Sequence, residues 1–141
     1  MSLNTKKTTH LFEAVEKEIL RQCNVERAKV GLVPLTWYED AYYFTAIRAE
    51  EAKDVFSHTR PKSKKWDTVY SDAGVILDGT FGENLFLSEG YDENSLLDII
   101  VQEWMDSPGH RANILNPGYT KIAIAIHQDG IVLSVAQNFF S

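Results

Sequence analysis

The sequence predicts a single α+β domain in which helices accompany a β-hairpin near the C-terminus. Apolar residues recur at helical spacing over residues 9–30 and 94–106, which indicates two amphipathic helices. Isoleucine and alanine alternate over 122–127, and a second apolar run over 131–139 follows a Gln-Asp-Gly turn, which indicates a hairpin. A length of 141 residues suits one domain, here residues 9–141, which buries roughly two-thirds of its unfolded surface and needs no metal or disulfide to fold.

Charge and hydropathy argue against two classes of protein. Lys and Arg number 14 against 20 Asp and Glu, a net charge of −6, and the one basic stripe is residues 60–65, so nucleic acid is not the expected main partner. No apolar run is long enough to span a bilayer, and residues 1–10 lack the apolar core of a secretory signal. We expect residues 1–8 to be a flexible N-terminus or the leftover of an expression tag, in which case a signal has been removed.

The first half of the chain is predicted to hold two helices. The helix over residues 9–30 is expected to be capped by Thr8 or Thr9 and to end at Gly31, a residue that suits the left-handed backbone after a helix. A second helix is expected over residues 38–55. Its many small side chains favour close packing of this helix on a sheet.

The second half begins with a long segment of weak pattern. Residues 56–80 are rich in His, Pro, Gly, Ser and charged residues and are expected to be irregular, and a loop of that length in a small domain is usually functional or wraps the surface. Residues 81–87 indicate a short strand. Asp92 or Asn94 is expected to cap the helix that runs over residues 94–106.

A histidine follows a helix-breaking tripeptide. Pro108 cannot continue a helix and disfavours helical backbone at Ser107, and Gly109 is expected to adopt dihedral angles that other residues avoid. His110 then opens a short second helical run, which holds its ring in place. A lone histidine at such a point is also explained as a helix cap or a core residue, so a site is predicted only together with two further stretches.

Those stretches contain His58 and Glu83. His58 lies where the chain leaves the second helix, which indicates either a position facing a cleft or a favourable contact with the negative end of the helix dipole. Glu83 lies in a strand-like run, where alternation places it on the same face as Phe81 and Leu85. An inward-facing carboxylate needs partners, because an unpaired buried charge costs several kcal/mol, and histidines are suitable ones.

Three interpretations of His58, Glu83 and His110 follow from their chemistry. Two imidazoles and a carboxylate suit a divalent metal such as zinc, with a coordination position left open. The same trio without metal forms an acid–base pair with an orienting carboxylate. It also suits a hydrogen-bonded network that pins loops together. The spacing along the chain does not distinguish these interpretations.

Several short motifs follow one another in order through residues 11–140. They are Arg27-Ala28 through Pro34-Leu35-Thr36-Trp37, Ala49, Phe56-Ser57-His58-Thr59-Arg60-Pro61, Gly82-Glu83-Asn84-Leu85, Trp104-Met105-Asp106-Ser107-Pro108-Gly109-His110-Arg111, and Ala136-Gln137-Asn138-Phe139. Each motif is weak, but their joint order and spacing are specific. Together they resemble the CAP superfamily (cysteine-rich secretory proteins, antigen 5 and pathogenesis-related 1), in its compact bacterial SCP-like branch.

The resemblance implies a three-layer α-β-α sandwich with a small, largely antiparallel sheet between helices. It also implies that His58, Glu83 and His110 meet in one open cleft, and that the domain is extracellular or on the cell surface. Larger eukaryotic members have a fourth cleft residue, a glutamate; the matching place here is near Asp106, a candidate only if the helix end turns it inward. Cys23 is the single cysteine, so the disulfides of those members cannot form.

The function that this resemblance implies is a non-catalytic SCP-like domain whose cleft binds a divalent cation. Two imidazoles make zinc the preferred ion, with magnesium or calcium still open, and a small molecule, lipid or cell-envelope component is the expected further partner. One alternative is a hydrolase that uses the metal or the His–Glu pair to activate water. Another is a structural cell-envelope or spore-associated module. No Ser or Cys stands in a recognisable nucleophile setting, so a non-enzyme is favoured, with the oligomeric state left open.

Three further residues are expected to support the cleft. Asn84 is expected to support Glu83 or a loop backbone. Arg60 is expected to pair with an acidic side chain or to attract an anionic ligand, with a surface salt bridge as the alternative. Gln137 is expected to satisfy backbone groups beneath the cleft.

Overall fold

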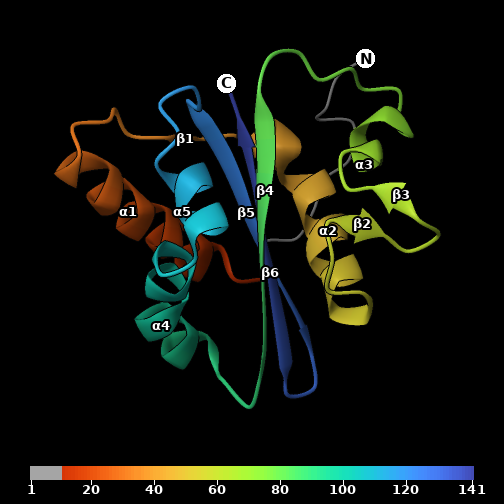
Figure 1. The fold of residues 1–141 in the computed structure, drawn as a ribbon. Coiled ribbons are helices and arrows are strands. Elements are labelled where there is room, and N and C mark those ends of the chain that lie inside the picture. Colours follow the sequence, from red (N-terminus) through yellow and green to blue (C-terminus); the bar gives the residue numbers. More distant parts are fainter. Residues whose placement is uncertain (1–10) are drawn as a thin grey trace.

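The computed structural model describes residues 11–141, which form a four-stranded sheet between two helical layers (Figure 1). One face of the sheet is covered by α1 (Glu13–Lys29), α4 (Glu93–Met105) and α5 (Pro108–Ile114). The other face is covered by η2 (Glu39–Ala41), α2 (Tyr42–Asp54), α3 (Thr68–Ser71) and a small hairpin of β2 (Thr59–Arg60) and β3 (Lys64–Lys65). The predicted α-β-α sandwich is confirmed.

The sheet has the strand order β1-β5-β6-β4. Its strands are β1 (Thr36–Trp37), β4 (Phe81–Glu89), β5 (Lys121–Asp129) and β6 (Val132–Phe140). The two long C-terminal strands form the predicted hairpin, β4 pairs antiparallel to β6, and β1 alone is parallel to its neighbour. β4 is therefore an edge strand, and both helical layers can reach its side chains.

The alternation of isoleucine and alanine in β5 separates the two layers of the core. Ile122 and Ile124 pack with the residues of α1 and α4, whereas Ala123 and Ala125 face the α2 side. Ala49 of α2 is buried in the same cluster as Ala125. Small side chains on both surfaces allow α2 to lie close to the sheet, as its composition predicted.

Two predicted helix boundaries are confirmed by their backbone geometry. Gly31 follows α1 with φ +78°, and the Leu32 N–H donates to the Arg27 carbonyl at 3.0 Å, which closes the helix end in a Schellman-type turn. Asp92 caps α4, because its side chain accepts a hydrogen bond of 2.7 Å from the Ser95 N–H.

The predicted start of the first helix is wrong by a few residues. α1 begins at Glu13 rather than at residue 9, and Phe12 at its N-cap offers no side-chain hydrogen bond. The expected caps Thr8 and Thr9, like the expected flexible segment 1–8, lie outside the described residues.

The prediction of an irregular segment over residues 56–80 is also wrong in part. The segment contains the β2–β3 hairpin and the short helix α3. The hairpin turns at Lys62 and Ser63, both with positive φ, and each of its strands is only two residues long. Strands this short carry no detectable alternation, so sequence periodicity misses them.

The break before His110 has a simpler cause than expected. Ser107 is the N-cap of α5 and Pro108 occupies its first turn, where the missing N–H is not needed. Gly109 lies inside this helix without the unusual dihedral angles that were predicted for it. The tripeptide therefore starts a new helix, and no glycine-specific conformation is required.

Candidate functional site

Glu83 is the buried centre of the site. β4 points its side chain toward α2, where the side chain has no exposed surface. The Arg48 guanidinium donates to both carboxylate oxygens, from Nη2 to Oε1 at 2.8 Å and from Nε to Oε2 at 3.0 Å. Asn138 Nδ2 donates to Oε2 at 3.0 Å, and His58 Nδ1 lies 3.1 Å from Oε1. The prediction of an inward carboxylate with a histidine partner is confirmed.

Arg48 is the functional residue that sequence reasoning missed. It is fully buried, and beyond Glu83 it donates to the Ser57 carbonyl at 2.8 Å and to Glu51 Oε1 at 2.8 Å. Burial alone would lower the pKa of Arg48, but its bonds to Glu83 and Glu51 outweigh burial and raise that pKa. One sequence signal could have indicated Arg48. It and Glu51 are three residues apart, on a helix face whose other side chains are apolar or small.

Arg60 links the β2–β3 hairpin to α2. Its guanidinium pairs with both oxygens of Glu51, at 3.0 Å from Nε to Oε1 and 2.9 Å from Nη2 to Oε2, and also bonds Thr68 and Asp72. The predicted acidic partner is confirmed, and at 16% side-chain exposure the pair is largely buried rather than a surface salt bridge. Burial would raise the pKa of Glu51, but Arg60 and Arg48 together hold it below its usual range.

His110 approaches from the opposite face of β4. Asn84 Nδ2 donates to the His110 carbonyl at 3.1 Å and to Gln137 Oε1 at 3.1 Å, and Asn113 donates to Asn84. Asn84 therefore supports the backbone of a helix, α5, where Glu83 or a loop backbone was predicted. Gln137 instead bonds side chains, Asn84 and the buried Cys23 sulfur, because the backbone around it is already paired within the sheet. The prediction for Gln137 is therefore wrong.

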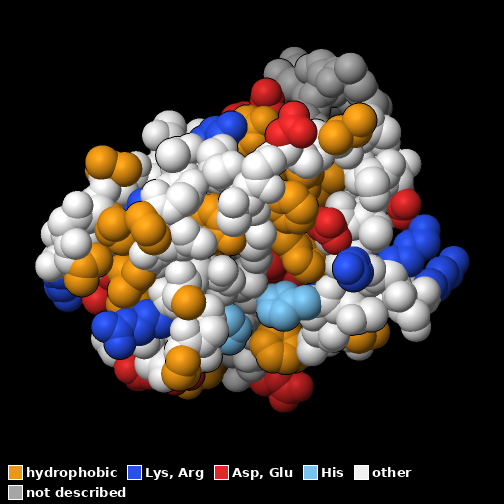
Figure 2. All heavy atoms as spheres, turned by 45° about the horizontal axis from the view of Figure 1, so that its top comes forward, with side chains coloured by type: hydrophobic (Ala, Val, Ile, Leu, Met, Phe, Trp, Pro, Cys, Tyr) orange, Lys and Arg blue, Asp and Glu red, His pale blue; other side chains and the backbone are white. Residues whose placement is uncertain are grey.

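β4 lies between α5, which carries His110, and the β2–β3 hairpin, which begins directly after His58 (Figure 1). Burial lowers the pKa of His110, and the charge of His58 lowers it further. The His58 side chain is 51% exposed above the fully buried Glu83 carboxylate. Figure 2 shows histidine side chains gathered on one face beside acidic and basic groups. The structure therefore brings all three predicted cleft residues to one place.

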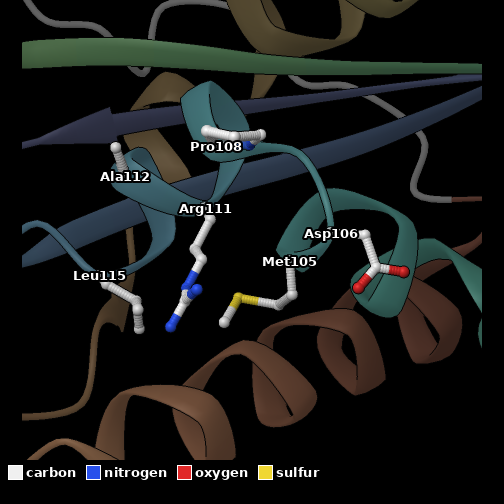
Figure 3. Close-up of a pocket in the computed structure, with 6 residues that line it drawn as sticks. All are labelled: Met105, Asp106, Pro108, Arg111, Ala112 and Leu115. Atoms are coloured by element: carbon white, nitrogen blue, oxygen red, sulfur yellow. The ribbon is translucent and has the colours of Figure 1, made fainter.

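Asp106 belongs to a different region. It is the exposed C-cap of α4, and its carboxylate accepts a hydrogen bond of 2.8 Å from Gln102. It lines a pocket of about 370 Å³ at the α4–α5 junction, where Met105 and Arg111 point toward α1 (Figure 3). None of the three cleft residues lines this pocket. The candidate fourth residue is not turned toward the histidines.

The donor set of the cleft is small. Among residues 11–141, no group of three His, Cys, Asp or Glu side chains is arranged to hold a metal ion. Both oxygens of Glu83 are already occupied, by Arg48, Asn138 and His58.

This α-β-α fold, with the buried Glu83 carboxylate beside His58, is that of an SCP-type domain. The chain belongs to the cysteine-rich secretory protein family (CAP), whose sequence profile matches residues 20–139. It is 31% identical over 121 residues to the uncharacterized Bacillus subtilis protein YkwD, a match that covers 84% of this chain and 45% of YkwD. It also matches the uncharacterized Bacillus subtilis membrane protein YlbC, at 30% identity over 79% of this chain and 31% of that protein. The chain thus spans less than half the length of these curated relatives.

Solved structures share the fold. An extracellular SCP-domain protein from Bacillus anthracis aligns with a TM-score of 0.74 at 22% identity, over 91% of this chain and 40% of that one. An outer surface protein from Borrelia burgdorferi aligns with a TM-score of 0.70 at 17% identity, over 100% of this chain and 98% of that one. NaASP2, solved with Zn²⁺, aligns with a TM-score of 0.70 at 13% identity, over 94% of this chain and 82% of that one. None of the helices described for residues 11–141 is long and apolar enough to cross a membrane.

Proposed function

We propose that this CAP domain works outside the cell or at its surface and binds a divalent cation, zinc by preference, through His58 and His110. The extracellular and outer-surface proteins among its structural neighbours support the location. Positions on the cation that the protein does not fill would accept water or a small ligand from solvent.

The observation that carries the proposal is the 3.1 Å contact between His58 Nδ1 and Glu83 Oε1. A carboxylate paired with Arg48 can only accept hydrogen bonds, so the proton of a neutral His58 ring belongs on Nδ1. The opposite nitrogen, Nε2, then carries the free lone pair that a metal needs. Carboxylate–histidine–metal arrangements of this kind orient the ligand and raise its basicity.

His110 suits the second ligand position. Its pKa lies below the usual range, because burial and the neighbouring His58 both disfavour the imidazolium, so the ring is neutral at neutral pH and can donate a lone pair. Two imidazole nitrogens favour zinc over magnesium, which prefers oxygen ligands and retains its water. The Zn²⁺ with which NaASP2 was solved supports this choice by analogy of fold. Glu83 acts here as an orienting group, not as a ligand.

Isothermal titration of zinc into metal-stripped protein at neutral pH tests the proposal. We expect micromolar binding that is lost in the His58→Ala/His110→Ala double variant. His127 lies on β5, outside the cleft, so the His127→Ala variant is the matched control and should bind like the wild type. Magnesium should give no comparable heat. Equal zinc heats in the wild type and the double variant would refute the site and leave a hydrogen-bonded or structural cleft.

A further inference from the structure

We propose that Arg48 is the positioning residue of the cleft: it sets the rotation and tautomer of the His58 ring by holding both the ring's acceptor and the backbone that carries the ring. The consequence for zinc affinity rests on the proposed function. The consequence for the ring itself does not, because it concerns the metal-free protein.

The first step of the argument is the fork that Arg48 makes with Glu83. Two nitrogens of one guanidinium edge, Nε and Nη2, each meet a different carboxylate oxygen, at 3.0 and 2.8 Å. A planar pair of this kind fixes the direction of the carboxylate as well as its place. Since Oε1 is also the oxygen that meets His58 Nδ1, Arg48 determines where that acceptor points.

The second step concerns the backbone on both sides of His58. Arg48 Nη2 donates to the carbonyl of Ser57, the residue before His58, at 2.8 Å. Arg48 Nη1 donates to Glu51, which in turn binds Arg60, two residues after His58. The segment that carries the histidine is therefore tied to α2 on either side. The Arg48 guanidinium itself makes the tie before His58, and Glu51, to which that guanidinium also donates, makes the tie after it.

The third step is the charge that this burial requires. The side chains of Arg48 and Glu83 both have 0% exposure. A buried carboxylate without a counter-charge is strongly unfavourable, and a guanidinium remains charged at all relevant pH values. Both oxygens of Glu83 accept from Arg48, and the geometry of this pair directs Oε1 toward His58 Nδ1, where it accepts the proton of the ring. A lysine at position 48 keeps the positive charge but cannot make the two parallel hydrogen bonds to Glu83. The Arg48→Lys variant therefore separates the effect of the charge from that of the hydrogen-bond geometry.

The test compares Arg48→Lys with Arg27→Lys, a matched change at the other fully buried arginine, which binds only backbone carbonyls away from Glu83. Long-range ¹H–¹⁵N spectra of the imidazole rings, recorded on metal-free protein, report which nitrogen carries the proton. We expect His58 to be the Nδ1–H tautomer in the wild type and in Arg27→Lys. In Arg48→Lys we expect it to shift to the Nε2–H form that free imidazole side chains favour.

Zinc affinity provides the second measurement. Loss of a group that orients a metal ligand typically weakens metal binding by about 10–100-fold, and we expect that loss in Arg48→Lys but not in Arg27→Lys. Should the wild type bind no zinc, the proposed function fails while the tautomer comparison still tests Arg48. An unchanged His58 tautomer in a folded Arg48→Lys protein would overturn the inference.

A measurement on the wild type covers the case in which Arg48→Lys does not fold. The guanidinium protons of Arg48 should give separate, slowly exchanging signals with cross-peaks to the His58 ring. A single averaged guanidinium signal would also overturn the inference, because it would mean that the fork is not held.

Discussion

Arg27 offers the sharpest test of how this fold is held together. It is fully buried on α1 and has four backbone carbonyl partners, those of Val33, Ile114, Asn116 and Tyr119, at 2.9, 2.9, 2.9 and 3.2 Å. One guanidinium thus joins the end of α1 to the loop before β1, the end of α5 and the loop before β5. Replacing Arg27 with Met keeps the apolar stem and removes every one of these donors.

The expected loss follows from the carbonyls left behind. A buried polar group without a partner costs about 1–3 kcal/mol, so the two fully buried carbonyls, those of Ile114 and Tyr119, imply a loss of about 2 kcal/mol even at the lower limit. The free energy of unfolding of such domains is about 5–15 kcal/mol, so the variant should lose at least about a seventh to two-fifths of its stability.

Urea unfolding followed by circular dichroism measures this loss. Arg21→Met is the matched control, because Arg21 lies on the same helix, is 64% exposed and pairs only with Glu18. We expect the control to change the free energy of unfolding by less than about 0.5 kcal/mol. A difference below about 1 kcal/mol between the two variants would refute the reasoning, since it would mean that the four hydrogen bonds contribute no more than a surface ion pair.

Three further predictions concern the hairpin, the edge strand and pH. Ser63→Gly should stabilise the protein by about 0.5–1 kcal/mol in the same urea assay, because Ser63 has φ +63°, which glycine adopts without cost. Gly82→Ala should destabilise by about 1–3 kcal/mol, because its Cβ would lie 2.5 Å from Tyr119 Oη, and Tyr119→Phe should recover part of that loss in a double-mutant cycle. In zinc-free protein, the lowered pKa of His110 means that the unfolded state binds more protons than the folded one just below pH 6.5, so the free energy of unfolding rises as the pH increases from acidic values to about 6.5 and then levels off. Thermal midpoints of His110→Gln should rise less over that range, and an equal slope would contradict this assignment.

Local patterns predicted much of the fold because the groups that they involve are close in sequence. The alternation in β5 is set by strand geometry, so Ile122 and Ala123 necessarily face opposite layers. Gly31 and Asp92 close and open helices through hydrogen bonds that span only a few residues. For the same reason, alternation along β4 was sufficient to place Glu83 toward the interior.

Contacts between residues that are distant in the sequence explain why some predictions about the site were incomplete or wrong. Arg48 and Glu83 are 35 positions apart, and no periodicity connects a helical arginine with a strand carboxylate. Gln137 was expected to bond backbone groups, yet its neighbours Asn84 and Cys23 come from other elements. The position of Asp106 depends on how α4 meets α5, which its own neighbours in the chain do not specify.

The amino-acid order was therefore enough to establish that a carboxylate at position 83 points inward, that His58 follows the second helix and that His110 lies near the start of a short helix. It was not enough to establish the partners of that carboxylate. A buried charge must be paired, but any of several cationic or hydrogen-bonding side chains could do so. The packing of α2 against β4 determines that the partner is Arg48. That packing placed Arg48 beneath the site, with the His58 ring exposed above the buried carboxylate.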